Sequence, residues 1–385
     1  MKIRTYIFLL IIVIINYPTY GQFSSEKEKL DYTNDLFEKK LFIEAEPEML
    51  NFLSTKNNSE FNFKYGVCAL FKYADKSKSL QYLERAVKDS KVDPRAYFYL
   101  GKANHFNYMF ADALSAYKKY KSLVSPKEAK SLEVDMHIKM CESGQSLMKN
   151  LSDLIVMKKT STGIDKFAYS YDIDEIGGKI LITDQFQSKI DEKLNYKSII
   201  YFPPVGQDVL FFSSYGKDGK TGLDIYLVNR MSTGEWSEPV RLPESINTPY
   251  DDSYPYLKPD GKTLYFSSKG HNSMGGYDIF RCSFDKLAGN YGPVNNLDYK
   301  INTPADDILY IVDDKDENAS FSSDRSSDGG KIDVYNVKVK VFPIQNTLIA
   351  GTFFNSSNPE DLKANIKVYD VKTDKLIGVY TVDDE

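Results

Sequence analysis

The pentapeptide Leu210-Phe211-Phe212-Ser213-Ser214 is the clearest sign of the architecture, because it returns twice further along the chain. It reappears as Leu264-Tyr265-Phe266-Ser267-Ser268 and, less closely, as Ala319-Ser320-Phe321-Ser322-Ser323, at offsets of 54 and 55 residues. Short runs rich in aromatic residues that end in small polar residues are typical of β-strands. A period of this length therefore predicts an array of equivalent β units.

Two other motifs keep the same interval. They are Asp224-Ile225-Tyr226, which returns at 278 and 333, and Ile246-Asn247-Thr248-Pro249, which returns at 301. The best copy predicts four short strands, at Ser253–Leu257, Thr263–Ser268, Tyr277–Phe284 and near Pro293–Leu297, with a tight turn at Lys258–Gly261. A degenerate earlier copy is expected at Phe167–Asp172 and Ile180–Asp184. Four strands per repeat predict a small β-propeller of about four or five blades over residues 155–342.

The β repeats resemble the TolB-like propeller repeats of exported proteins. The resemblance rests on Tyr254-Pro255, Pro259-Asp260-Gly261-Lys262 and Gly275-Gly276-Tyr277-Asp278-Ile279-Phe280. The first and last copies depart from it, since Pro203-Pro204-Val205-Gly206 and Asp313-Asp314-Lys315-Asp316 replace the Pro-Asp-Gly turn.

Length and composition are those of a soluble protein with two or three domains. The chain has 385 residues, of which 42% are hydrophobic and 27% charged. Three histidines and three cysteines argue against a multinuclear metal site and against a disulfide scaffold. A net charge of −5 argues against general nucleic-acid binding. Residues 22–150 hold 21 basic and 18 acidic residues, against 26 and 36 in residues 151–385, which favours a domain boundary near 150.

The first 21 residues have the pattern of a secretory signal. Lys2 and Arg4 precede an unbroken apolar run over Ile7–Ile15, which is too short to span a membrane as a helix. Thr19 and Gly21 suit a cleavage before Gln22, and no cysteine lies there to accept a lipid. An uncleaved anchor is the alternative. We expect an exported, periplasmic protein with no transmembrane segment after cleavage.

Residues 22–150 show helical spacing. Tyr97, Leu100-Gly101, Asn104, Ala113, Tyr117, Tyr120 and Pro126 together resemble a tetratricopeptide (TPR) repeat, and a weaker copy runs from Tyr65-Gly66 to Ala86. Small residues let two helices touch while aromatic residues fill the spaces between turns. Two further helices are expected at Glu26–Glu44 and Lys127–Lys149. An unrelated helical bundle is the alternative.

Several residues of the helical region invite a functional interpretation. Tyr97, Tyr99, Phe106 and Tyr108 are candidates for a groove that binds a partner peptide, or for the core. His105 and His137 are expected to be solvated or capping residues and not ligands. Cys68 and Cys141 are expected to be buried free thiols, with a disulfide as the alternative.

The polar residues of the β repeat are expected to be structural. Asp224, Asp278 and Asp333 recur at one place in each unit, where a carboxylate would accept N–H groups of turns or of the neighbouring unit. Asp251-Asp252, Asp306-Asp307 and Asp313–Asp316 are expected to be solvated loop carboxylates, with a cation-binding rim as the alternative. His271 is too isolated to be a catalytic base, and Gly216–Gly222 is not followed by the helix that a phosphate loop needs. We therefore predict no catalytic, cofactor-binding or metal-binding residue and no cofactor.

Residues 345–385 predict three strands, at Leu348–Phe354, Asn365–Asp370 and Leu376–Val382. Ile349-Ala350-Gly351-Thr352, Ile366–Asp370 and Thr373-Asp374-Lys375 resemble the start of a carboxypeptidase-regulatory-like β-sandwich. This segment is too short to close such a sandwich, so we expect a fragment of a longer protein.

The order of the parts resembles multidomain OmpA-family proteins of the Bacteroidota, some of which are periplasmic components of type IX secretion and gliding machinery. The resemblance implies a C-terminal OmpA-like domain that holds peptidoglycan, which is missing from this sequence. We therefore expect a non-enzymatic periplasmic scaffold, associated with the outer membrane, that links envelope proteins of a secretion system to the cell wall. A propeller that binds a glycan or peptide is the alternative, and an enzyme is a third, weaker one.

Overall fold

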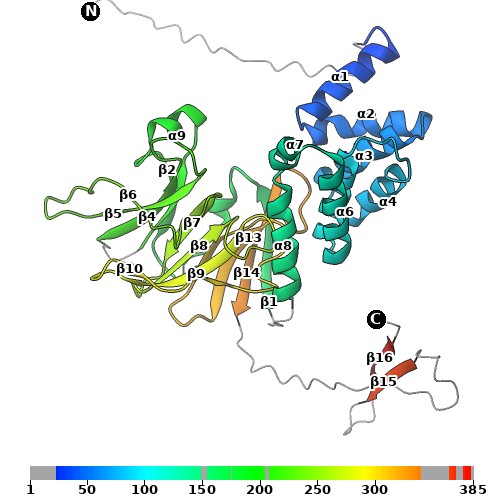
Figure 1. Cartoon of the computed structure of the whole chain (residues 1–385). Coiled ribbons are helices and arrows are strands. Elements are labelled where there is room, and N and C mark those ends of the chain that lie inside the picture. The colour runs from blue at the N-terminus through cyan, green and yellow to red at the C-terminus, as the bar shows by residue number, and fades with distance from the viewer. Residues whose placement is uncertain are drawn as a thin grey trace, which may run out of the picture. The chain divides into compact units, whose positions relative to one another are not determined.

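The computed structural model describes residues 23–148, 154–174, 176–203, 208–339, 364–369 and 376–382. The predicted signal segment, the strand at Leu348–Phe354 and the turn at Pro203–Gly206, apart from Pro203 itself, lie outside these residues. Residues 1–342 form one compact unit and residues 343–385 a second. In the described parts no helix has the length and apolarity needed to cross a membrane. Helices come first and antiparallel sheets follow (Figure 1).

The helical part consists of eight α-helices, each packed on a neighbour in the chain. They are α1 (Glu26–Glu38), α2 (Phe42–Thr55), α3 (Ser59–Lys72), α4 (Ser77–Ala86), α5 (Arg95–Phe106), α6 (Phe110–Leu123), α7 (Pro126–Ser131) and α8 (Val134–Leu147). The predicted small residues lie at close contacts. A Cβ atom on Gly101 would lie 2.6 Å from the Tyr117 ring, and one on Gly66 would lie 2.8 Å from Leu83 Cγ. Glycine therefore sets the distance between these helices.

The two predicted flanking helices are each broken. Glu26–Glu44 divides into α1 and α2 because Lys40 adopts a φ of 61°, which ends one helix and redirects Phe42 into the core. Lys127–Lys149 divides into α7 and α8 because Glu133 has a φ of 50°. Neither residue is glycine, so the sequence carries no local sign of these left-handed positions.

Each copy of the serine-ended motif forms the same strand of a separate sheet. The copies are β4 (Val209–Ser214), β8 (Thr263–Ser268) and β13 (Asn318–Ser323), which pair with β5 (Asp224–Asn229), β9 (Asp278–Asp285) and β14 (Lys331–Val339). The register is identical, since Ser214, Ser268 and Ser323 each lie opposite the aspartate that opens the next strand. The equivalent strands thus have equivalent neighbours, as the repeat predicts.

The remaining strands complete these sheets. They are β6 (Val240–Arg241) beside β5, β7 (Asp252–Leu257) beside β8, β10 (Asn290–Tyr291) and β11 (Asn295–Asn296) beside β9, and β12 (Asp307–Val312) beside β13. All four strands predicted for the best copy are therefore present. None of the described sheets closes on itself.

The earlier, degenerate copy differs from the prediction. Phe167–Ser170 is a short 3-10 helix and not a strand, and it buries Phe167 against the β core. The second predicted strand is present as β2 (Lys179–Thr183), which pairs with β3 (Ser198–Phe202) across a short helix, α9 (Lys189–Leu194).

The first strand of the β part pairs with the last sheet. Strand β1 (Leu154–Gly163) runs antiparallel to β14 and is the edge strand of the order β1-β14-β13-β12. This pairing joins the two ends of the β part, about 170 residues apart in sequence, by main-chain hydrogen bonds.

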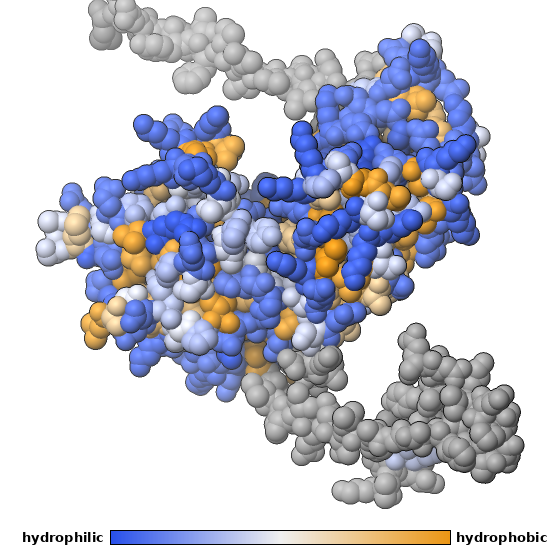
Figure 2. All heavy atoms as spheres, viewed as in Figure 1, coloured by the Kyte–Doolittle hydropathy of each residue, from blue (hydrophilic) through white to orange (hydrophobic). Residues whose placement is uncertain are grey.

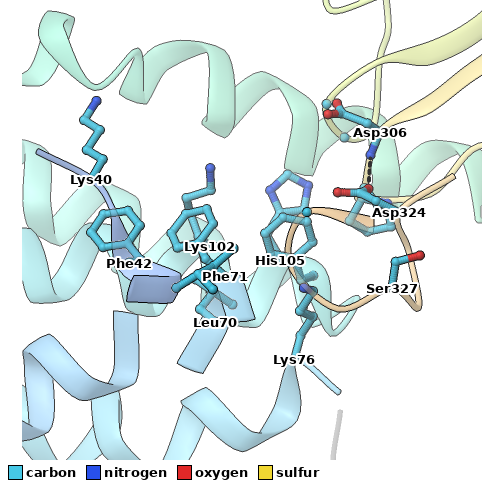
Figure 3. Close-up of a pocket in the computed structure, with 18 of the residues that line it drawn as sticks. Lys40, Phe42, Leu70, Phe71, Lys76, Lys102, His105, Asp306, Asp324 and Ser327 are labelled. Carbon is cyan, nitrogen blue, oxygen red and sulfur yellow. Dashed lines mark hydrogen bonds between the residues drawn. The ribbon is translucent and has the colours of Figure 1, made fainter. Parts of the chain in front are cut away.

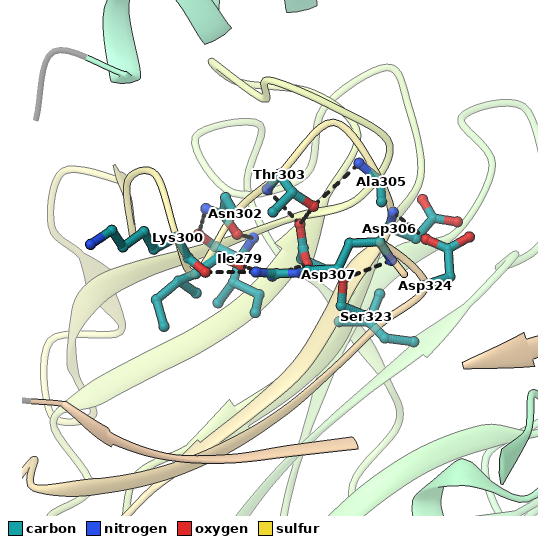
Figure 4. A network of polar contacts seen from close by, with 12 residues as sticks. Ile279, Lys300, Asn302, Thr303, Ala305, Asp306, Asp307, Ser323 and Asp324 are labelled. Carbon is teal, nitrogen blue, oxygen red and sulfur yellow. Dashed lines mark hydrogen bonds and ion pairs between the residues drawn. The ribbon is translucent and has the colours of Figure 1, made fainter. Parts of the chain in front are cut away.

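The Ile-Asn-Thr-Pro motif joins each sheet to the next (Figure 4). The side chain of Asn302 accepts the Ile279 N–H at 2.7 Å and donates to the Ile279 carbonyl at 2.9 Å. Thr303 donates its N–H and its hydroxyl to Asp307 in the following strand. The same arrangement recurs one sheet earlier, where Asn247 bonds the N–H and carbonyl of Ile225 and Thr248 donates its N–H and hydroxyl to Asp252. The motif is therefore a structural clamp between sheets.

The described residues of the second unit form two strands, β15 (Ala364–Tyr369) and β16 (Leu376–Val382), which pair antiparallel. They coincide with two of the three strands predicted there. In the first unit, the face shown in Figure 2 is mostly hydrophilic, with small apolar areas between charged residues.

Candidate functional site

Polar contacts, one of them fully buried, join the helical part to the β part. His105 on α5 lies with Nε2 2.8 Å from the Met274 carbonyl oxygen, and Met274 belongs to the core of the helical part. The Gly329 N–H donates to the Lys72 carbonyl at 2.8 Å, and the Ala74 N–H donates to Asp328 at 2.9 Å. These contacts hold the two parts together around a shared cavity.

The cavity has a volume of about 650 Å³ and lies between the helices and the loops that carry the serine ends of β8 and β13 (Figure 3). Its helical wall includes Phe71, Lys76 and Lys102, and its β wall includes Asp306 and Asp324. Sites for small molecules usually measure 300–1,000 Å³ and combine apolar walls with a few polar groups. This cavity is therefore the candidate functional site.

Two lysines of the helical wall have no carboxylate partner. Lys102 Nζ lies 5.7 Å from the centre of the Phe71 ring and 5.9 Å from that of Phe106, and Lys76 Nζ lies 5.9 Å from that of Phe106. No described carboxylate lies within ion-pair distance of either amine. Burial lowers the pKa of both amines, and Asp306 and Asp324 offset this only in part, by acting on Lys102 and Lys76 respectively. An anion beside them would restore the charged form.

The acidic side chains of the β wall already have partners. Asp306 accepts the Tyr277 N–H at 2.8 Å, and its own N–H donates to Asp324 at 2.9 Å. Burial, followed by the charge of Asp306, raises the pKa of Asp324 to about 6. These N–H bonds leave the carboxylates charged, and the lining holds as many acidic side chains as lysines. Lys76 and Lys102 of the helical wall, which have no ion pair within the described residues, mark its positive side.

The two histidines at the cavity are neutral. Burial lowers the pKa of His105 to about 4 and also lowers that of His137, whose ring stacks on Tyr117 at 5.4 Å. The neutral His105 donates from Nε2 to the Met274 carbonyl, which leaves Nδ1 as an acceptor. The prediction that His105 is solvated or capping is wrong, because the β part covers it, and His137 is half-buried.

The four aromatic residues considered for a groove do not form one surface. Tyr99 is in the core, and the Tyr97 hydroxyl donates to the Val87 carbonyl within the helical part. Phe106 lines the cavity, whereas Tyr108 packs edge-on against Tyr299 of the β part at 5.8 Å. The core interpretation is confirmed for Tyr99, and Tyr97, Phe106 and Tyr108 are partly buried against the same core.

The repeated aspartates are buried and structural. Asp278 accepts from the Met274 N–H, Ser273 and Asn296, whereas Asp224 accepts both arms of Arg241, and Asp333 pairs with Lys159. The predicted role as a turn acceptor is confirmed for Asp278. The other two aspartates have a cation of their own sheet as partner.

The predicted solvated carboxylates include two that are fully buried. Asp252 and Asp307 are 0% exposed, so the prediction of solvated carboxylates is wrong for both. Each accepts the N–H and hydroxyl of the threonine in the Ile-Asn-Thr-Pro clamp, which replaces the bonds to water. Arg325 adds a cation to Asp307, whereas burial raises the pKa of Asp252 to about 7. Asp313 accepts N–H groups of its own turn, and Asp251 pairs with Lys269. Within the described ranges, no three acidic, histidine or cysteine side chains are grouped as a metal site would need.

The other residues singled out in the sequence are also structural. His271 bonds the Ile246 carbonyl and packs against Phe266 and Phe280. Gly216–Gly222 joins β4 to β5, so no helix follows it. Cys68 and Cys141 are buried and unpaired, as expected.

Several residues of the cavity lining were singled out in the sequence, among them His105, Phe106, His137 and Asp306. Lys76 and Lys102 were missed, and the one local signal of Lys102 is that it stands among the small or apolar residues Leu100-Gly101 and Ala103. The β-side lining comes from loops of two repeats and from Ile164 after β1, so only the long-range fold brings it together.

We compared the chain with models of known protein families, with curated proteins and with solved structures, and none of the three comparisons gave a match.

Proposed function

We propose that this chain is a non-enzymatic interaction protein of the bacterial envelope, exported to the periplasm and associated with the outer membrane. In this proposal it links components of a type IX-like secretion machinery to the cell wall. Peptidoglycan binding is assigned to an OmpA-like domain, which the resemblance places after the sandwich-like segment.

The exposed edge strand β1 carries this proposal. Val156 and Met157 are 49% and 61% exposed, and Ile164 just beyond the strand is 60% exposed. An edge strand has unpaired main-chain groups, and exposed apolar side chains on it are typical of a surface that binds another protein. The register shift between Val156 and Lys158 and the two lysines that follow protect part of this edge, so the exposed apolar side chains at Val156 and Met157 are what favours an interaction role.

A propeller built from TolB-like repeats and a helical part built from TPR-like pairs would suit this role, because both present large rigid surfaces. The pairing of β1 with β14 supports the propeller, since closing a ring of sheets requires the first strand to join the last unit. Equivalent registers in three successive sheets support it as well.

The test is a pull-down from detergent-solubilised envelope with the chain from Gln22 onward as bait. We expect recovery of outer-membrane, secretion-system or wall-anchored proteins, and their loss with Met157→Asp. Leu287→Asp is the matched control, because Leu287 is 99% exposed in the hairpin between β9 and β10. Equal recovery with the unsubstituted chain, Met157→Asp and Leu287→Asp would refute the assignment of the interaction to β1.

A second candidate function is the binding of a small ligand, and the cavity between the helical and β parts favours it. Glycan or peptide retention without any protein partner would support this function in place of the scaffold.

A further inference from the structure

We propose that the cavity binds the free carboxylate end of a short peptide, with the carboxylate beside the ammonium group of Lys102. This site goes beyond the scaffold role, because it uses the cavity between the helical and β parts and not Val156 or Met157 of β1. The inference rests on Lys102, on the apolar wall beside it and on the unpaired hydroxyl groups of the lining.

Lys102 offers a place for an anion. It is half-buried beside two aromatic rings and has no ion pair within the described residues, so a ligand anion would form a charge-assisted hydrogen bond there. Lys40 and Lys269 add to the positive potential at Lys102, whereas Asp306 and Asp324 oppose it. Figure 3 shows the Lys40 and Lys102 side chains extending in the same direction. Asp306 and Asp324 act on Lys102 only from across the cavity, and neither forms an ion pair with it within the described residues.

The apolar wall favours a singly charged ligand with a hydrophobic flank. Phe71 and Phe106 lie beside Lys102, and Phe42 stacks on Phe71 at 4.9 Å. Bringing a doubly charged phosphate beside these rings would cost more desolvation energy than bringing a carboxylate. A peptide end combines the required carboxylate with an apolar side chain.

Two hydroxyl groups of the cavity lining support a polar ligand. Tyr117 and Ser327 line the cavity, and neither hydroxyl has a hydrogen-bond partner within the described residues. Buried hydroxyl groups are almost always bonded, so unpaired ones indicate a site that a polar molecule completes. Oxygen atoms of a peptide end can accept from both groups.

The volume limits the ligand to a few residues. About 650 Å³ is in the middle of the range for small-molecule sites, which bury most of the ligand surface. The site therefore suits the end of a peptide and not an extended segment of a folded protein.

The test uses the chain from Gln22 onward and a pool of random tetrapeptides with free carboxyl ends, compared with the same pool amidated. Retention after equilibrium dialysis is measured by mass spectrometry. We expect the free-carboxyl peptides to bind at least about tenfold more tightly, which corresponds to one charge-assisted hydrogen bond. Equal retention of both pools, or retention of neither, would overturn the proposal.

Three variants locate the site. Lys102→Met keeps the apolar stem and should lower retention about tenfold or more, whereas Lys102→Arg keeps the charge and should retain most binding. The matched control is Lys121→Met, because Lys121 is an exposed lysine on α6 that pairs with Asp135 away from the cavity. Thermal unfolding should show no loss of stability in Lys102→Met, since the substitution removes an unpaired charge.

Binding by Lys102→Met equal to that of the parent chain would refute the assignment, as would stronger binding of phenyl phosphate than of the peptides. If the peptides bind as predicted and the envelope pull-down recovers no protein, the cavity proposal stands and the scaffold proposal fails. If the pull-down recovers envelope proteins and the peptides do not bind, the cavity proposal fails and the scaffold proposal stands.

Discussion

Replacing Asn302 with alanine removes the side chain that clamps β9 to the following sheet. Asn302 is fully buried, and its amide makes hydrogen bonds to the Ile279 N–H, the Ile279 carbonyl and Asn296 at 2.7, 2.9 and 2.7 Å. After the substitution the Ile279 carbonyl still accepts from the Leu297 N–H, and Asn296 still accepts from the Asp298 N–H. Only the Ile279 N–H loses its partner.

The expected loss of stability follows from these bonds. An unpaired buried N–H costs about 1–3 kcal/mol, and each of the two other bonds contributes about 0.5–1.5 kcal/mol net. Asn302→Ala should therefore lower the free energy of unfolding by roughly 2–6 kcal/mol, which is a large part of the roughly 5–15 kcal/mol typical of a native protein.

Urea unfolding followed by tryptophan fluorescence measures this loss. The single tryptophan, Trp236, lies in the β part beside Phe186, so it reports on the sheets and not on the helices. Asn295→Ala is the control, because the Asn295 side chain is exposed and bonds only the Pro293 carbonyl. A loss in Asn302→Ala no larger than that in Asn295→Ala would show that the motif is not a clamp.

Three further predictions concern packing, pH and thiol reactivity. Gly101→Ala places a Cβ atom 2.6 Å from the Tyr117 ring and should lower the free energy of unfolding by about 1–3 kcal/mol. The helical circular dichroism signal should therefore melt at a lower temperature, and an unchanged melting temperature would contradict the close contact. Burial raises the pKa of Asp252 to about 7 and that of Asp278 to about 8, so the native state keeps protons that the unfolded chain releases. Between pH 6.5 and 8 the two groups should lower stability by about 2 kcal/mol, and the three histidines, whose pKa values burial lowers, should offset roughly 1 kcal/mol of this. Asp278→Asn should flatten the fall, and a rise with pH would show that both aspartates are ionised. All three cysteines are buried with raised pKa values, so a thiol reagent should label them only as the protein unfolds.

The strands of the β part were predictable because their signals are local. Alternating side chains, the Pro-Asp-Gly turn and the 54–55-residue interval place β7, β8 and β9 within a residue or so of the predicted bounds. Register follows as well, because a shift of one residue would turn the buried aromatic residues to the outside.

The helix ends and the cavity were not predictable for a different reason. Lys40 and Glu133 take left-handed conformations that their residue types disfavour, so packing imposes them. His105 is buried only because a loop 169 residues later covers it. Lys102 lies across the cavity from the β wall because of the same long-range packing, which cannot be predicted from a short stretch of sequence.

Successive repeats are argued to form equivalent sheets that are joined by the same asparagine clamp. Amide hydrogen exchange at Ile225 and Ile279 is the sharpest test of this equivalence. Both N–H groups donate to the buried asparagine of the Ile-Asn-Thr-Pro motif at 2.7 Å. We expect both to exchange among the slowest amides of the chain and at rates within about tenfold of each other, because both open only when a sheet separates from the next. Exchange of either amide as fast as in an exposed loop would contradict the clamp and, with it, the equivalence of the repeats.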